Sequence, residues 1–309
     1  MKPIIGIVIA LVLPVISFSQ PSIPAEVQKQ IEDDLQKCGS KTREVRCAVT
    51  GTDDWIFLQE SLVNLTVGWK DNSKAFLAFN DSLRNRGIAL VVVPVPDKFQ
   101  VAAGHYSAEF SGGIVAPQYE KWVRSLRDRG IVVIDAMDAF LKQDKTTPMF
   151  EAYESHCTDE ARRILARMVA GAINRMNLDL PRKRWVLQDT VVPGTGNLFH
   201  LKYDRNLEYD VHVQKVVDEK GKKYQSSKSA PVIVIGDSNA DFGWNSSSNI
   251  GAYIAHMTGI ETFTHSKIGG GNAGATIFKG RDNFLKGKKV VVWVFDGREL
   301  YGVFKMPEF

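Results

Sequence analysis

The chain has 309 residues, of which 44% are hydrophobic and 24% charged, and its formal net charge is +4 at pH 7. These proportions are typical of a globular protein with one large core or two modest ones. So small a net charge, with no basic cluster interleaved with aromatic residues, argues against a nucleic-acid partner.

Residues 1–19 predict a targeting segment. Lys2 supplies a short positive start, and the apolar run over 4–16 is too short for a comfortable membrane span. Small residues follow where a signal peptidase cuts, so we expect a signal peptide that is cleaved before Gln20. An uncleaved anchor is the alternative. In either case the folded part lies outside the cytoplasm.

Residues 20–50 predict an N-terminal helix and a disulfide loop. Apolar residues recur at near-helical spacing over 21–36, which indicates a short amphipathic helix. An oxidising compartment favours disulfides, so we pair the neighbouring cysteines Cys38 and Cys47. Cys157 is then left over, and we expect it to be a partly buried free thiol.

Residues 51–309 alternate short β-branched runs with amphipathic stretches. This alternation of predicted strands and helices indicates right-handed βαβ units and a mainly parallel sheet, and therefore the α/β class. The predicted strands are 51–58 (after a turn), 88–96, 131–134, 231–235 and 289–295. The predicted helices are 69–87, 119–129, 136–142, 158–176, 249–258 and 276–285.

Residues 184–228 have a different character. Polar and apolar residues alternate there, as in Tyr209-Asp-Val-His-Val213, and a turn-forming stretch follows at 218–221. Alternation with period two is typical of half-buried antiparallel strands. We therefore expect a β-rich insertion of hairpins within the α/β domain.

The run Pro231-Val-Ile-Val-Ile-Gly-Asp-Ser238 ends a buried strand on a glycine and a serine. In open α/β sheets, ligands bind at the carboxyl ends of the strands. Gly236 permits a tight turn there, so Ser238 can present its hydroxyl at the rim of the sheet. The sequence thus offers Ser238 as a candidate nucleophile, with an ordinary serine turn as the alternative.

A serine nucleophile needs a base within reach and an acid that orients the base. Among six histidines, His156 stands out because it lies in Glu154-Ser-His156, just before a helix capped by Thr158. In an extended segment, residues two apart share one face, so Glu154 can hold the imidazole of His156. The alternative is a loop histidine beside a chance acid.

The glycine-rich turn Ile268-Gly-Gly-Gly-Asn-Ala-Gly274 supplies candidate donors for an oxyanion. The backbone N–H of Ser238 is one donor. The N–H groups of Gly270 or Gly271 and the side-chain amide of Asn272 are others. The turn lacks the Lys-Ser/Thr of a phosphate-binding P-loop.

Several short motifs, taken in order, resemble the SGNH-hydrolase-like acetyltransferase domain of the alginate O-acetyltransferase family. The family has an opening Gly-x-Asp-Gly-Trp-Leu-Phe-Leu, a Val-Pro-x-Pro-x-Lys stretch, an Asp-x-His pair, a Gly-Asp-Ser nucleophile motif and a terminal Trp-Glu-Phe…Arg-x-Leu segment. The matching pieces here are Gly51-Thr-Asp-Asp-Trp-Ile-Phe-Leu58, Val93-Pro-Val-Pro-Asp-Lys98, Glu154-Ser-His156, Gly236-Asp-Ser238, and Trp293-Val-Phe295 followed by Arg298 and Tyr301. The resemblance covers about residues 51–305, and the acid and histidine precede the serine as they do in the family.

The resemblance implies a three-layer SGNH-type fold and periplasmic transfer of acetyl groups to hydroxyls of an alginate-like exopolysaccharide. It implies that Ser238 is the nucleophile, that His156 is the base and that Glu154 is the acid that orients the base. Further oxyanion or substrate residues would be Asp237, Arg298 and Tyr301. It also implies a polysaccharide acceptor and a membrane-bound acyltransferase as acetyl donor. The chemistry needs no metal and no organic cofactor.

Three departures from the family pattern leave other functions open. Glu154 replaces the usual Asp, Cys157 replaces an aromatic residue, and Asn239 replaces a bulky one. One alternative is a carbohydrate acetylesterase that uses the same three side chains with water as acceptor. The other is a non-catalytic protein that binds polysaccharide or assists assembly.

Overall fold

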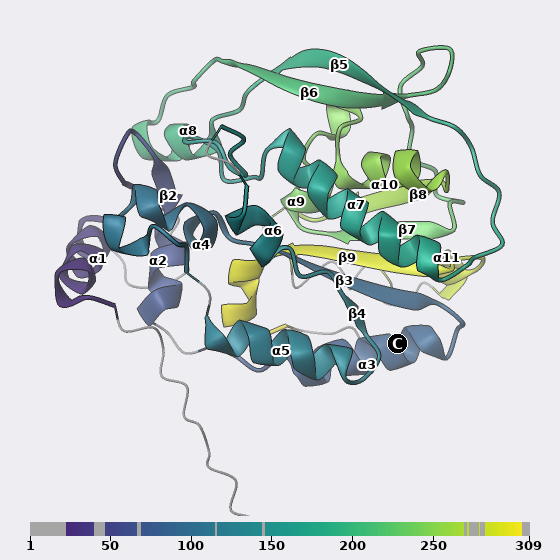
Figure 1. Cartoon of the computed structure of the whole chain (residues 1–309), viewed down its shortest axis with the longest axis horizontal. Coiled ribbons are helices and arrows are strands. Elements are labelled where there is room, and N and C mark those ends of the chain that lie inside the picture. Colours follow the sequence, from purple (N-terminus) through teal and green to yellow (C-terminus); the bar gives the residue numbers. More distant parts are fainter. Residues whose placement is uncertain are drawn as a thin grey trace, which may run out of the picture.

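Figure 1 shows the computed structural model of the chain. The structure describes residues 23–39, 47–66, 69–114, 116–143, 146–268, 271, 278 and 282–304. The predicted signal peptide lies outside these ranges. Among the helices within them, none combines the length and the hydrophobicity that crossing a membrane requires.

A parallel sheet of five strands forms the centre of the molecule, in the order β4-β3-β9-β7-β8. Four of the five predicted strands form part of this sheet as β3, β4, β7 and β9, and their apolar side chains are buried on both faces as in other covered parallel sheets. The edge strand β8 was not predicted, because its sequence is half polar. The bounds are β3 Ala89–Val95, β4 Val132–Val133, β7 Val232–Gly236, β8 Thr262–Ser266 and β9 Val290–Asp296.

Helices cover both faces of this sheet, which confirms the predicted three-layer α/β fold (Figure 1). Alternate residues of β3 point to opposite sides: Val91 and Val93 pack with α7 and α10, whereas Leu90 and Val92 pack with α3 and α5. The bounds are α3 Ser73–Arg84, α5 Pro117–Arg127, α6 Met137–Leu141, α7 Asp159–Arg175, α10 Ile250–Thr258 and α11 Asp282–Leu285.

The N-terminal segment packs against the domain through a separate small core. Val27, Ile31 and Leu35 of α1 (Ala25–Lys37) are buried beside Phe57 and Phe99. Strand β1 (Ala48–Thr50) pairs with β2 (Ile56–Leu58), so the residues before and after position 51 belong to one small sheet. The short helices of this region are α2 Gln59–Thr66, α4 Lys98–Ala102, η1 Ala103–His105 and η2 Ala108–Phe110.

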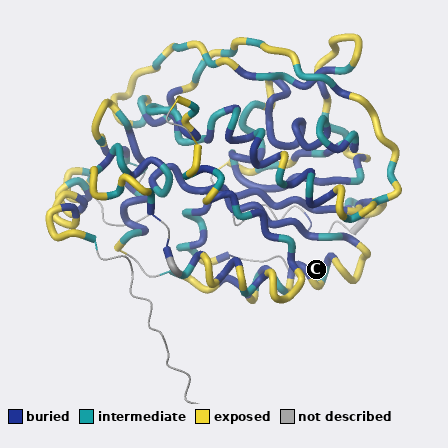
Figure 2. The backbone as a smooth tube through the Cα atoms, viewed as in Figure 1, coloured by how far each residue is buried: buried dark blue, intermediate teal, exposed yellow. Residues whose placement is uncertain are grey.

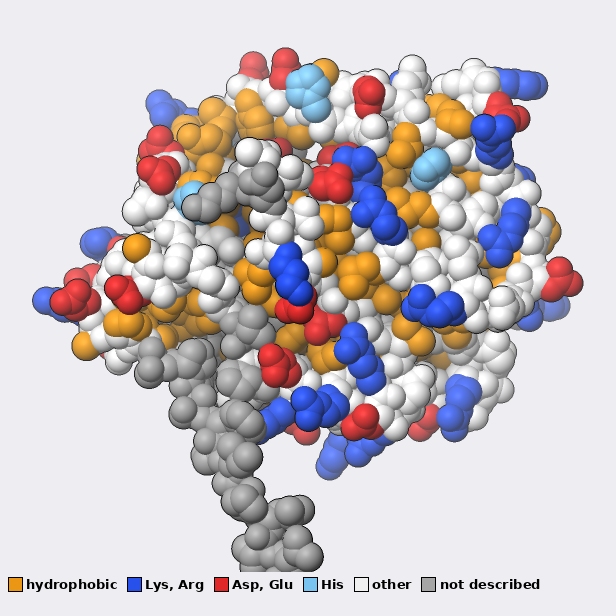
Figure 3. Space-filling view, in the orientation of Figure 1, with side chains coloured by type: hydrophobic (Ala, Val, Ile, Leu, Met, Phe, Trp, Pro, Cys, Tyr) orange, Lys and Arg blue, Asp and Glu red, His pale blue; other side chains and the backbone are white. Residues whose placement is uncertain are grey.

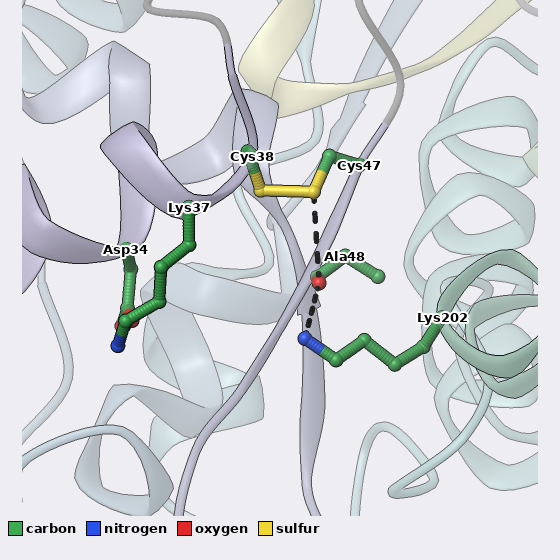
Figure 4. Close-up of a disulfide and its surroundings, with 6 residues drawn as sticks. All are labelled: Asp34, Lys37, Cys38, Cys47, Ala48 and Lys202. Carbon is green, nitrogen blue, oxygen red and sulfur yellow. Dashed lines mark hydrogen bonds and ion pairs between the residues drawn. A yellow bond between two sulfur atoms is a disulfide. The ribbon is translucent and has the colours of Figure 1, made fainter.

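Cys38 and Cys47 form a disulfide, as predicted (Figure 4). Cys157 is a free thiol, as expected, but it is fully buried and not partly buried. The bridge joins the end of α1 to the residue before β1. The carbonyl of the adjacent Ala48 accepts a hydrogen bond from the Lys202 ammonium at 3.0 Å. The disulfide region is therefore tied to the later part of the chain that carries Lys202.

The insertion is a two-stranded antiparallel ribbon that arches over α7 and α10 (Figure 1). Its strands are β5 (Val186–Pro193) and β6 (Asp210–Val217), which confirms the predicted antiparallel pairing over 184–228. Helix α8 (Asn197–Tyr203) lies between them and was not predicted. Figure 2 shows that the ribbon is far more exposed than the dark-blue central sheet.

Candidate active site

Ser238 stands at the carboxyl edge of the sheet, as the first residue of the single turn α9 (Ser238–Asp241) after β7. Gly236 is required here because a Cβ would lie 1.7 Å from the carbonyl oxygen of Val294. The carboxylate of Asp237 then accepts the N–H of Asn239 at 2.8 Å and that of Asp296 at 2.7 Å. These bonds fix the turn to β9 and leave Ser238 half-buried.

Glu154 and His156 are held together in the loop before α7. The Nδ1 of the imidazole lies 2.6 Å from Oε1 of Glu154, whose side chain is only 3% exposed. Oε1 also accepts the N–H of Ser155 at 2.9 Å, and Oε2 accepts the hydroxyl of Thr195. The predicted pairing of acid and histidine is thus present, although the acid is Glu and not Asp.

The carboxyl of Glu154 is ionised in this setting. Burial alone raises its pKa, but the hydrogen bonds from His156 and Thr195 outweigh burial, and the pKa is lowered from its ordinary value. An ionised Glu154 accepts the proton on Nδ1 of His156. The imidazole then has Nε2 as the nitrogen that can take up a proton.

His156 and Ser238 line the same cavity, which has a volume of about 1220 Å³. The imidazole stacks on Phe242, whose N–H donates to the carbonyl of Ser238 at 2.8 Å. In the part of the chain that the structure describes, no hydrogen bond joins the imidazole directly to the Ser238 hydroxyl. Hydrogen bonds of catalytic groups are often long without substrate and tighten when it binds.

The predicted oxyanion residues are only partly described. Gly270 and Asn272 lie outside the described residues. Gly271 is buried, and its carbonyl accepts the indole N–H of Trp293 at 3.0 Å. A Cβ on Gly271 would lie 3.2 Å from Oδ2 of Asp237, so Gly271 lies close to the turn that carries Ser238.

Of the other predicted residues, Arg298 lines the cavity, whereas Asp237 and Tyr301 do not. Arg298 contacts Oδ2 of Asp296 at 2.6 Å and Oδ2 of Asp97 at 3.4 Å, so the guanidinium is bound by carboxylates of its own protein. Tyr301 packs against Trp69 with 5.2 Å between ring centroids, and burial raises its pKa to about 12.

Several residues that surround the pair of Glu154 and His156 carry no signal in the sequence. Asn197 accepts the N–H of Ser155 through Oδ1 at 2.9 Å and donates from Nδ2 to its hydroxyl at 2.7 Å. Thr195 and Asn197 both come from the insertion, some forty residues away, and no local pattern marks them. Within the described ranges, no three His, Cys, Asp or Glu side chains form a group that could hold a metal ion.

Comparison with known proteins identifies the family. The family model described as the SGNH hydrolase-like domain of the acetyltransferase AlgX matches residues 48–296. The chain belongs to this family. It is therefore an AlgX-type O-acetyltransferase domain. No curated protein sequence is significantly similar to it.

Solved structures show the same fold at low identity. The O-acetyltransferase domain of Pseudomonas putida AlgJ is 18% identical with a TM-score of 0.65, over 82% of this chain and 92% of that one. Pseudomonas aeruginosa AlgX is 19% identical with a TM-score of 0.62, over 81% of this chain and 62% of that one. Bacillus cereus PatB1 is 10% identical with a TM-score of 0.51, over 84% of this chain and 100% of that one. This chain thus spans less than two thirds of AlgX.

Proposed function

We propose that this domain acts in the periplasm and transfers acetyl groups to hydroxyls of an alginate-like exopolysaccharide, with Ser238, His156 and Glu154 as the catalytic residues. The single observation that carries the proposal is the pair of the buried Glu154 and the half-buried His156, 2.6 Å apart, lining the same cavity as Ser238. An acid that orients a base next to a serine at a sheet edge is the arrangement that acyl transfer to a hydroxyl requires.

The first half-reaction acylates Ser238. Nε2 of His156 takes the proton of the Ser238 hydroxyl while Oγ attacks the carbonyl carbon of the acetyl donor. The tetrahedral intermediate collapses, the bond to the leaving group breaks, and His156 returns the proton to that group. Glu154 stabilises the imidazolium that forms in between.

The second half-reaction runs in the same way with a sugar hydroxyl. His156 takes its proton, the sugar oxygen attacks the acetyl carbon, and Ser238 leaves with the proton. The developing oxyanion would be bound by the N–H of Ser238 and by donors of the glycine-rich turn, for which Gly270, Gly271 and Asn272 are the candidates.

The size and lining of the cavity favour a polymeric acceptor. Its volume of about 1220 Å³ exceeds the roughly 300–1,000 Å³ of most small-molecule sites. Val191 of β5 and Val211 of β6 line one part, and Trp244, six residues after the nucleophile, lines another. Figure 3 shows positive and negative side chains interspersed over the face in view, an arrangement that does not favour nucleic acid.

The disulfide supports a site of action outside the cytoplasm, where such bonds persist. The signal peptide predicted over residues 1–19 would deliver the domain there. A membrane-bound acyltransferase is the proposed source of the acetyl group. This donor is inferred from the family alone.

The test uses a chromogenic acetyl ester as donor, with and without acceptor oligosaccharide. We expect Ser238→Ala to lose ester cleavage and sugar acetylation while it still binds the oligosaccharide, and Ser229→Ala, a change at an exposed serine, to keep both activities. Acetylated sugar among the products excludes a pure esterase. Unchanged activity in Ser238→Ala would overturn the catalytic assignment.

A further inference from the structure

Lys98 lies beneath the loop that carries Glu154 and His156, with its ammonium buried. It is the first residue of α4, three positions after the end of β3, and it is only 4% exposed. Nζ donates to three backbone carbonyls: those of Glu151 at 2.7 Å, Ala152 at 2.8 Å and Glu154 at 3.1 Å. An ammonium has three N–H donors, so this set of acceptors saturates it.

Burying this charge is costly. Among the described residues, no carboxylate oxygen lies within ion-pair distance of Nζ, although the rings of Trp55 and Phe57 lie 5.0 and 5.4 Å from it. Burial lowers the pKa of Lys98, whereas the carboxylates of Glu154, Asp97 and Glu151 and the three carbonyl acceptors favour its charged form. A methionine would fill similar space without the cost of burying a charge. The benefit of a lysine at this position must therefore come from its three hydrogen bonds to the backbone carbonyls.

The three carbonyls belong to the irregular segment that leads into His156. Between the isolated bridge partners Phe150 and Cys157, the segment has no helix or strand of its own. Backbone N–H groups of other segments also donate to its carbonyls: Ile56 N–H to that of Ala152 at 3.0 Å, and Leu198 N–H to that of Tyr153. Lys98 alone contacts three of its carbonyls, including that of Glu154 itself.

We propose that Lys98 is a positioning residue for acyl transfer, whose ammonium fixes the backbone of residues 151–154 so that Glu154 meets Nδ1 of His156. This inference rests on the proposed function. Lys98 does not touch the reacting atoms. It acts through the placement of Glu154, whose distance to the imidazole would lengthen if the three carbonyls lost their common donor.

A second buried lysine provides a matched control. Lys288 is 5% exposed, donates to the carbonyls of Lys228 and Ala230, and lies 5.7 Å from the ring of Phe284. Burial lowers its pKa as well. It does not line the cavity. Lys288→Met therefore removes a buried ammonium with comparable contacts, away from the proposed site.

The experiment compares Lys98→Met, Lys288→Met and the parent protein in cleavage of the chromogenic ester, with folding checked by circular dichroism. We expect Lys98→Met to lower kcat by about tenfold or more with little change in KM, because a displacement of 1 Å can cost ~100-fold. Lys288→Met should stay within about twofold. If Lys98→Met does not fold, Lys98→Leu replaces it, since leucine also fills apolar space and has no N–H donor.

A proton NMR spectrum separates positioning from stability. The proton between Nδ1 of His156 and Glu154 should give a far-downfield signal in the parent protein and in Lys288→Met. We expect that signal to be lost in the folded Lys98 variant. A folded Lys98 variant with the parent's kcat and downfield signal would overturn the inference. If Ser238→Ala also keeps full activity, the proposed function itself has failed, and the two failures are thereby distinguished.

Discussion

The imidazole of His156 stacks on the ring of Phe242, with 4.2 Å between ring centroids and 10° between ring planes. Phe242 follows α9, which begins with Ser238, so this contact connects the loop of the proposed base His156 to the turn of the proposed nucleophile Ser238. The guanidinium of the buried Arg162 lies 5.2 Å from the centroid of the same ring. Phe242 thus restricts both the position and the tilt of the imidazole.

Replacing Phe242 with leucine should lower kcat for ester cleavage by roughly 2–12-fold, because an aromatic contact is worth about 0.5–1.5 kcal/mol beyond its buried area. Leucine keeps apolar volume but offers no flat face to the imidazole. Steady-state kinetics measure the change. Phe263→Leu, which alters a ring contact with Phe284 away from the cavity, serves as control and should keep the parent's kcat.

Glu154→Gln should lower kcat by about 10²–10⁴-fold without unfolding the protein. The amide has the same shape, but it cannot stabilise an imidazolium and can favour the wrong tautomer of His156. Single-turnover acetylation of Ser238, followed by mass spectrometry, reports the loss directly. A variant that acylates at the parent's rate would show that Glu154 has no part in the chemistry.

The same substitution gives a pH test of stability. Because the folded pKa of Glu154 lies below its ordinary value of 4.5, the ionised carboxyl stabilises the fold above that pH. This stabilisation is lost as the pH falls through the lowered folded pKa. Urea unfolding of parent and Glu154→Gln at several pH values from 7 to 3 should show the free-energy difference shrinking in acid. A constant difference would contradict the assigned ionisation.

Trp244→Ala should weaken binding of a polymeric acceptor and spare the small ester. The indole is 45% exposed and lines the cavity, where a flat apolar face can stack on sugar rings. We expect KM for acceptor oligosaccharide to rise about tenfold, which corresponds to roughly 1.4 kcal/mol. Tyr203→Ala removes an aromatic side chain of similar exposure that does not line the cavity, and KM should not change.

Replacing both Cys38 and Cys47 with serine should lower the free energy of unfolding by about 2–3 kcal/mol, as expected for so short a closed loop in the chain-entropy model. Chemical denaturation under oxidising conditions measures the loss. Parent protein treated with reductant should match the double variant. Equal stability of oxidised parent and variant would refute a stabilising role.

The central fold could be predicted because each buried strand is marked by its own β-branched run. Val232–Ile235 and Val290–Phe295 are apolar throughout, and the two strands lie side by side in the parallel sheet. Strand β8 escaped prediction because Thr262, Thr264 and Ser266 are polar and the strand lies at an edge. Helix α8 escaped because its seven residues follow a left-handed Gly196 and gain their burial mainly through Leu198.

Members of the candidate site could be predicted only where residues close in sequence are also close in space. Glu154 and His156 are two residues apart, so a local argument sufficed to pair them. Ser238 was found from the strand that precedes it. Thr195 bonds Glu154 and Asn197 bonds Ser155 across some forty residues, and the bonds from Lys98 cross more than fifty, so these contacts depend on the completed fold.

The ribbon of β5 and β6 enters the chain between the base and the nucleophile. The connection between its two strands supplies Thr195 and Asn197, which bond the loop of Glu154. The strands themselves border the cavity where an acceptor would lie. Under the proposed function, changes along the strands alter which polymer fits, and the groups that make and break bonds stay as they are. Acceptor choice and reactivity can therefore diverge separately as such enzymes evolve.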